Sequence, residues 1–382
     1  MRVLIVGLTA TGISFASDLA NAGVSVVATD PDTKLHGLSS KNLAYVPFTK
    51  EEMAKFDTAD AVIFVFAPMP VGQVSPNGAF DLGPLTTLLT HLQSLCPLTV
   101  AHVVICSPVP PGYFAKYLPV AINPEASKRA GYMPLTKRVF DMETILFGSD
   151  GMFLRFLSTG LFEWTEAHDK IKFASVATIE VVHIAAHAFQ AMKHTFLHQL
   201  DALLDVLGIN GLDGDREVQH VLQNHALVGK LGYTARSAYG GLVQTQAVAC
   251  LTELFARYQI PGQMLMDSMD AASNGLLGQT AAMEVYEYNE ALKAGETPPK
   301  FVLTVLDDAG SVSPDDVPHS SLLRRAALVA AKNVPVAVVF EEPTLTRIKA
   351  LYGDRFEYRV LTVKEQEEEE EQSSVLKPDA DS

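Results

Sequence analysis

The first thirty residues impose the strongest constraint on the fold of this chain. RVLIVG, which begins at Arg2, is a short apolar run that indicates a buried strand. TGISFASDLANAG follows with the apolar spacing of a helix and ends at Gly23, and VSVVATD then indicates a second strand. A strand, a helix and a strand within about 30 residues open a doubly wound parallel sheet.

The same signals continue along the first part of the chain. ADAVIFVFAP and LTVAHVVICS indicate further strands, and DLGPLTTLLTHLQSL indicates a helix between them. We therefore expect a Rossmann-like dinucleotide-binding domain over residues 1–150. From about residue 173 to residue 207 the chain has a helical pattern without Gly or Pro, which predicts one long helix inside a helical central domain over residues 151–294.

The last part of the chain returns to an alternation of strands and helices. FVLTVLDD and VPVAVVFEE indicate strands, and SSLLRRAALVAAKN and TLTRIKALYG indicate helices, so a smaller α/β domain is expected over residues 295–363. Residues 364–382 begin KEQEEEEEQ, a composition that predicts a disordered acidic tail. The predicted class is α/β, with a Rossmann-like sheet, a helical middle domain and a small C-terminal α/β domain.

Composition excludes several classes of partner. The formal net charge of −15 argues against nucleic acid, whose binding needs Lys and Arg to displace counterions. No apolar run reaches the roughly 18 residues that span a bilayer, so no membrane partner is expected. The chain opens directly on a strand pattern with no secretory signal ahead of it, and its three cysteines form no metal-binding spacing. A cytoplasmic location follows as the expectation.

The turn after the first strand stands where a dinucleotide fingerprint belongs. It reads Gly7-Leu-Thr-Ala-Thr-Gly12, whereas the fingerprint is G-x-G-x-x-G. Asp30 ends the second strand, where an acidic side chain would bond the ribose hydroxyls of NAD. Thr9 replaces the glycine that lets the backbone approach the pyrophosphate, so NAD is predicted to bind with reduced affinity. The alternative is a sheet that retains the fold without the ligand.

Four further motifs follow this turn in order and carry a family resemblance. A strand ends near Pro68 and Pro70, Asp81 and Leu82 begin a helix, the next strand breaks on SPVPPG from Ser107, and an Asn-Pro-Glu segment ends at Glu125. In this order they resemble the UDP-glucose/GDP-mannose (nucleotide-sugar) dehydrogenase family. Proline-fixed turns at the carboxyl ends of strands suit a rigid wall of a ligand crevice.

The resemblance implies site residues and a reaction. The family oxidises a nucleotide-sugar alcohol to a carboxylate in two NAD-dependent steps, through a cysteine thiolate with a lysine and an asparagine beside it. It implies cofactor contacts at Gly7, Thr9, Gly12, Asp30, Pro68 and Ser107, and a substrate cleft at Pro110, Pro111, Gly112, Gly240 and Gly241. The candidate catalytic residues are His183 at the lysine position, His187 at the asparagine position, and Glu125.

The chain departs from the family where the chemistry is concentrated. The cysteine position is Val243, which cannot act as a nucleophile, and a nucleotide-contacting arginine position is Pro318. Cys250 lies two helical turns further on and reads as a core residue. We therefore expect the fold, but not the four-electron oxidation. The chain is then a pseudoenzyme, or an oxidoreductase that performs one two-electron step with His183 as base. The alternative is an interaction scaffold, homo-oligomeric (a dimer or larger) through the long helix.

Histidines repeat along one face of that helix. The spacing of Glu180, His183, His187, His194 and His198 leaves three interpretations open. The side chains line a polar groove or a subunit contact, His183 is a general base, or an i,i+4 pair binds a divalent metal with Glu180 as a third ligand. No established metal-binding spacing accompanies the histidines, so no metal is expected.

Overall fold

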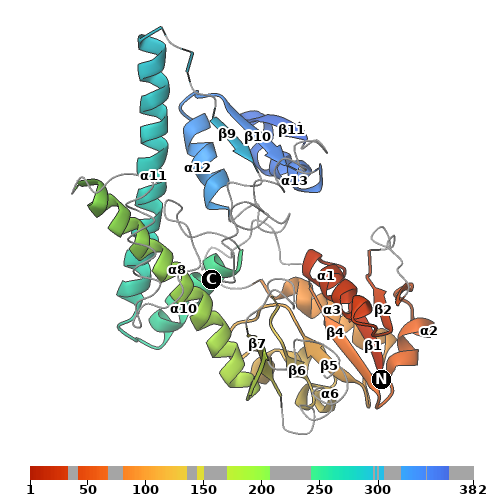
Figure 1. The fold of residues 1–382 in the computed structure, drawn as a ribbon. Helices are drawn as coiled ribbons and strands as arrows, with labels where there is room; N and C mark the ends of the chain where they lie inside the picture. Colours follow the sequence, from red (N-terminus) through yellow and green to blue (C-terminus); the bar gives the residue numbers. More distant parts are fainter. Residues whose placement is uncertain are drawn as a thin grey trace, which may run out of the picture. The chain divides into compact units, whose positions relative to one another are not determined.

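The computed structural model (Figure 1) describes residues 1–32, 42–67, 81–135, 144–149, 170–206, 242–295, 297–298, 301–304, 320–340 and 342–360. The chain divides into two compact units. The first holds Met1–His187 with Ala249–Glu253, and the second holds Ala188–Val248 with Leu254–Ser382. The predicted tail at 364–382 lies outside the described residues.

An eight-stranded sheet forms the centre of the first unit, in the order β3-β2-β1-β4-β5-β6-β7-β8. All neighbours are parallel except β6 and β7. The strands are β1 (Arg2–Val6), β2 (Val26–Thr29), β3 (Leu43–Tyr45), β4 (Ala61–Val65), β5 (His102–Ile105), β6 (Gly131–Tyr132), β7 (Ile145–Gly148) and β8 (Ile171–Ala174).

Helices cover both faces of this sheet (Figure 1). Helix α1 (Ala10–Asn21) packs Phe15 and Leu19 on one face, with the Phe15 ring 4.9 Å from that of Phe64. Helix α3 (Gly83–Leu95) packs its leucines on the other face. Since both faces are covered, the central strands consist mostly of apolar residues, and all five residues of β4 are apolar and buried. The predicted doubly wound α/β class is confirmed. The short helices are α2 (Lys50–Met53), η2 (Ala54–Phe56), α4 (Tyr113–Lys116), α5 (Leu118–Ala121) and α6 (Pro124–Lys128).

The sheet extends further along the chain than the expected first domain. Strand β8 lies beyond residue 150, and its last two residues fall where the sequence pattern predicts the long helix to begin. These residues are in a strand because β8 pairs in parallel with β7 over four residues. The predicted boundaries at 150, 294 and 363 remain predictions.

The long helix is α8 (Val176–Val206), close to the expected range. Helices α10 (Leu242–Arg257) and α11 (Gln263–Lys293) complete the described helical middle of the chain. No helix among these residues, or elsewhere in the described ranges, has the length and apolar character needed to cross a membrane.

A small parallel sheet follows in the second unit, as expected. Its order is β11-β10-β9, and the strands are β9 (Phe301–Thr304), β10 (Val336–Phe340) and β11 (Glu357–Val360). Helices α12 (Ser321–Ala330) and α13 (Glu342–Tyr352) and a 3-10 turn η7 (Gly353–Arg355) accompany it. Ser320 caps α12, because its hydroxyl accepts a hydrogen bond from the backbone N–H of Leu323 at 3.2 Å.

A half-buried ion pair joins α12 to α11. The Nε atom of Arg325 lies 3.5 Å from Oε1 of Glu284, and the Arg325 guanidinium lies 5.6 Å from the ring centroid of Phe301. Burial raises the pKa of the Glu284 carboxyl, and the positive charge of Arg325 opposes that shift. The guanidinium therefore places a positive charge beside a half-buried carboxylate of α11.

We expect Arg325→Ala to reduce the free energy of unfolding by about 2 kcal/mol, because it leaves Glu284 without its cation. Lys293→Ala is the matched control, since Lys293 pairs with Glu290 at the surface, and it should lose less than about 1 kcal/mol. Chemical denaturation followed by circular dichroism measures both variants. Equal losses would contradict a special role for the Arg325 pair.

Candidate functional site

The turn between β1 and α1 is closely packed. Gly7 has φ +97°, and a Cβ atom there would lie 1.7 Å from the carbonyl oxygen of Phe66. A Cβ atom on Gly12 would lie 2.3 Å from the carbonyl oxygen of Gly7. Packing of the turn on β4 and on itself therefore requires both glycines, whether or not a ligand binds.

Asp30 holds this turn from the end of β2. Its Oδ2 atom accepts a hydrogen bond from the backbone N–H of Leu8 at 2.6 Å, and its Oδ1 atom accepts one from Asp32 N–H at 2.7 Å. A carboxylate has about four acceptor positions, so these two bonds leave capacity for ribose hydroxyls. The arrangement at Asp30 fits the ribose of a dinucleotide.

Thr9 begins α1 as its N-cap. Its φ and ψ of −64° and 164° are extended values that any residue adopts, so the turn does not require glycine there. The Thr9 hydroxyl accepts the backbone N–H of Gly12 at 3.1 Å. One donor at the helix N-terminus is therefore engaged within the protein. The turn fits a diphosphate less well than it fits the ribose.

Ser107 joins the carboxyl ends of β4 and β5. Its buried hydroxyl accepts a hydrogen bond from the backbone N–H of Ala67 at 2.7 Å. This bond fixes the start of the proline loop, residues 107–112. The neighbouring cofactor candidate Pro68 lies outside the described residues, and so do Gly240 and Gly241 of the expected cleft.

The far end of the proline loop turns sharply into α4. Gly112 has φ +88°, the left-handed region in which glycine is favoured. Pro110 and Pro111 have no N–H group, and the carbonyl oxygen of Pro110 accepts the N–H of Tyr113 at 3.2 Å. The N–H of Val109 donates to the Tyr132 hydroxyl at 3.1 Å.

A carboxylate from the long helix closes this turn. Glu180 Oε2 accepts the N–H of Gly112 at 2.8 Å, and Oε1 accepts the N–H of Phe114 at 2.9 Å. Only 2% of Glu180 is exposed. Burial raises the pKa of this carboxyl, while the backbone hydrogen bonds act in the opposite direction.

His183 lies one turn further along α8 and is 4% exposed. Its ring centroid is 4.7 Å from that of His187 and 6.5 Å from that of Tyr132. Its Nε2 atom is buried without a hydrogen-bond partner. Burial, with a smaller contribution from His187, lowers the pKa of His183 to about 3. The imidazole is therefore neutral at physiological pH.

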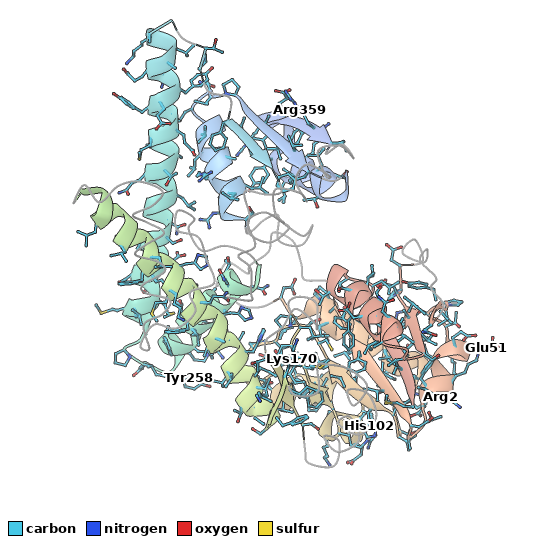
Figure 2. All side chains as sticks on the ribbon, in the orientation of Figure 1. Arg2, Glu51, His102, Lys170, Tyr258 and Arg359 are labelled. Carbon is cyan, nitrogen blue, oxygen red and sulfur yellow. The ribbon has the colours of Figure 1, made fainter. Side chains whose placement is uncertain are left out.

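Glu125 lies away from these residues, near the amino ends of the strands rather than their carboxyl ends. Its exposed carboxylate pairs with Lys128 at 2.8 Å. Arg129, four residues on, donates to the carbonyl oxygens of Leu98 and Thr99, shortly before β5 begins. Figure 2 labels Arg2 and His102, the first residues of β1 and β5, at this end of the sheet. The structure thus brings His183 and His187 together and leaves Glu125 apart.

Two contacts of this site escaped the sequence analysis. Tyr132 anchors Val109 through the register of β5 and β6, and no sequence signal indicated this. Glu180 entered one of the three interpretations of the helix as a possible third metal ligand, whereas both its oxygens accept backbone N–H groups. Among the described residues, no three His, Cys, Asp or Glu side chains are grouped so as to hold a metal ion.

The neutral His183 predicts a dependence of stability on pH. The unfolded chain binds a proton at this residue below pH 6.5, whereas the folded chain does so only near pH 3. The folded state therefore loses stability as pH falls through this window, by about 1.4 kcal/mol per unit. Between pH 7.5 and pH 5 we expect the wild type to lose about 2 kcal/mol more than His183→Leu.

Urea unfolding at the two pH values measures this difference, with the exposed His91→Gln as control. The His91 variant should keep the slope of the wild type. A His183→Leu variant with an unchanged slope would show that His183 is not the buried neutral group.

Comparison with known proteins identifies the fold. No family model matches the chain, and no curated protein matches it. A UDP-glucose dehydrogenase from Pyrobaculum islandicum is similar in structure, with a TM-score of 0.71 and 19% identity, over 94% of this chain and 85% of that one. A UDP-D-ManNAc dehydrogenase from Pyrococcus horikoshii has a TM-score of 0.60 and 15% identity, over 94% and 90%.

An NDP-N-acetyl-D-galactosaminuronic acid dehydrogenase from Methanosarcina mazei has a TM-score of 0.57 and 10% identity, over 94% of each chain. These identities support a conclusion about the fold. The predicted resemblance is confirmed at that level, and the loss of catalytic residues remains a prediction. The chain has the nucleotide-sugar dehydrogenase fold.

Proposed function

We propose that this chain binds a dinucleotide, NAD, on the nucleotide-sugar dehydrogenase fold without performing the four-electron oxidation of an alcohol to an acid. The observation that carries the proposal is Asp30, which directly follows β2 and holds the Gly7–Gly12 turn by accepting the Leu8 N–H at 2.6 Å. The turn and the acidic side chain are preorganised together at the carboxyl ends of two neighbouring strands, where such sheets bind ligands.

The residues in the catalytic positions support a non-catalytic protein. Val243 has no nucleophilic atom, and the neutral His183 cannot supply the positive charge of a lysine to a developing oxyanion. A pKa of about 3 also makes His183 a weak base for a one-step hydride transfer. We therefore favour the pseudoenzyme over the one-step oxidoreductase.

The second ligand of the proposal is a nucleotide or nucleotide sugar beside the proline loop, as the resemblance implies. The proposed location is the cytoplasm, which suits three free cysteines.

Thr9→Gly tests the cofactor site. Removing the side chain exposes the Gly12 N–H and opens the approach to the diphosphate, so we expect NAD⁺ affinity to rise about tenfold. Calorimetric titration measures it. The control is Thr49→Gly, which removes another N-cap threonine, on α2, and should leave NAD⁺ affinity unchanged.

Two results would count against the proposal. One is the absence of NAD⁺ binding by both the folded wild type and Thr9→Gly. The other is NADH production at 340 nm when NAD⁺ and UDP-glucose are supplied to the wild type, with two equivalents per sugar, since that is the four-electron oxidation.

A second candidate function is a homo-oligomeric scaffold, and one feature of α8 favours it. Val182, Phe189, Phe196 and Leu203 recur at seven-residue intervals and are all exposed, Phe189 by 53% and Phe196 by 59%. A seven-residue period keeps apolar side chains on one seam, which suits packing against another helix. We propose that this stripe packs against a second copy of the chain.

Phe189→Glu combined with Phe196→Glu tests the stripe. Placing two charges in an apolar contact should shift the protein from oligomer to monomer in sedimentation equilibrium. Met283→Glu is the control, because Met283 is an exposed apolar residue of α11 and lies outside the stripe. A monomeric wild type, or an oligomer that survives the double substitution, would contradict the scaffold.

A further inference from the structure

We propose that Glu180 is a positioning residue: it fixes the proline loop as one wall of the ligand crevice, without touching a ligand itself. The part of this inference that concerns ligand affinity rests on the proposed function. The part that concerns the loop rests on geometry within the first unit alone.

The proline loop supplies few hydrogen bonds of its own. Three of its six residues are prolines without an N–H group, namely Pro108, Pro110 and Pro111. Among the donors that remain in the loop, Val109 N–H reaches the Tyr132 hydroxyl and Gly112 N–H reaches Glu180, which also accepts the N–H of Phe114 just beyond the loop. The loop is therefore held from outside, by β6 at its middle and by α8 at its end.

Two backbone donors two residues apart, Gly112 and Phe114, require a carboxylate in particular. Each Glu180 oxygen accepts one N–H, at 2.8 Å and 2.9 Å. A glutamine side chain has one acceptor oxygen and an NH₂ group, which would face one of the two N–H donors. Among the described residues, no Lys or Arg forms an ion pair with Glu180, so the backbone N–H groups compensate its burial.

The anchored loop lies at the same end of the sheet as the dinucleotide turn, beside the carboxyl ends of the strands. Ser107 joins the start of the loop to Ala67 after β4, and β4 pairs with β1, which leads into Gly7. The carboxyl ends of parallel strands all lie at one end of the sheet, and open α/β sheets bind their ligands there. Glu180, a residue of α8, therefore fixes the shape of the loop at this ligand-binding end of the sheet.

Hydrogen exchange of the full-length Glu180→Gln variant tests the anchor directly. We expect the amide of either Gly112 or Phe114 to exchange at least about tenfold faster than in the wild type, because glutamine leaves one of these two donors without an acceptor. Glu51→Gln, at an exposed glutamate of α2, is the control and should leave these amides unchanged. Unchanged exchange in Glu180→Gln would overturn the proposal.

Chemical rescue separates an acceptor from a packing group. In Glu180→Ala, added acetate should slow the exchange of the Gly112 and Phe114 amides, whereas chloride at the same ionic strength should not. Equal effects of acetate and chloride would show that Glu180 acts through packing, and would overturn the assignment. If the alanine variant does not fold, the exchange of Glu180→Gln still decides.

Calorimetry connects the anchor to function. NAD⁺ affinity should fall about tenfold in Glu180→Gln and remain that of the wild type in Glu51→Gln. If the wild type binds no NAD⁺, the proposed function fails while the exchange experiment still decides the anchor. Faster exchange with unchanged NAD⁺ affinity would overturn the functional half of the inference.

Discussion

The Glu180 carboxylate accepts the N–H groups that a proline-rich loop leaves exposed where it turns into α4. Prolines make the loop stiff but deprive it of donors, and Gly112 bends it into a conformation that other residues rarely adopt. A loop of this kind needs an acceptor from elsewhere in the fold. The same turn of α8 that buries Glu180 leaves Val181 and Val182 exposed, so one segment serves the loop on one side and offers the apolar stripe on the other.

Sequence reasoning succeeded where local pattern and packing agree. The elements β1, α1, β2, β4, α3 and β5 have strong apolar periodicity, and the structure forms each of them. Strands β3, β6, β7 and β8 have only two to four residues, and their identity depends on pairing with neighbours that are distant in sequence. The strand propensity of so few residues cannot predict these strands, because pairing with neighbouring strands determines whether they form.

The candidate site was predictable in the same uneven way. Gly7, Gly12 and Asp30 were found from spacing, but the structure assigns both glycines a packing role that exists without ligand. The sequence alone does not distinguish the surroundings of Glu125 and Glu180. In the structure Glu125 is exposed and pairs with Lys128, whereas Glu180 is buried and accepts backbone hydrogen bonds. Burial sets that difference, and burial depends on how the helices close on the sheet. His183 follows the same rule, since desolvation keeps its imidazole neutral.

The proposed function depends above all on a dinucleotide binding at the turn held by Asp30. A crystal structure of the full-length chain grown with NAD⁺ tests it most directly. We expect density for a ribose against Asp30 and for a diphosphate at the N-terminus of α1 beside Thr9, with the Glu180 anchor of the proline loop intact. A fully occupied dinucleotide elsewhere, or a turn that remains unchanged and empty at saturating NAD⁺, would contradict it.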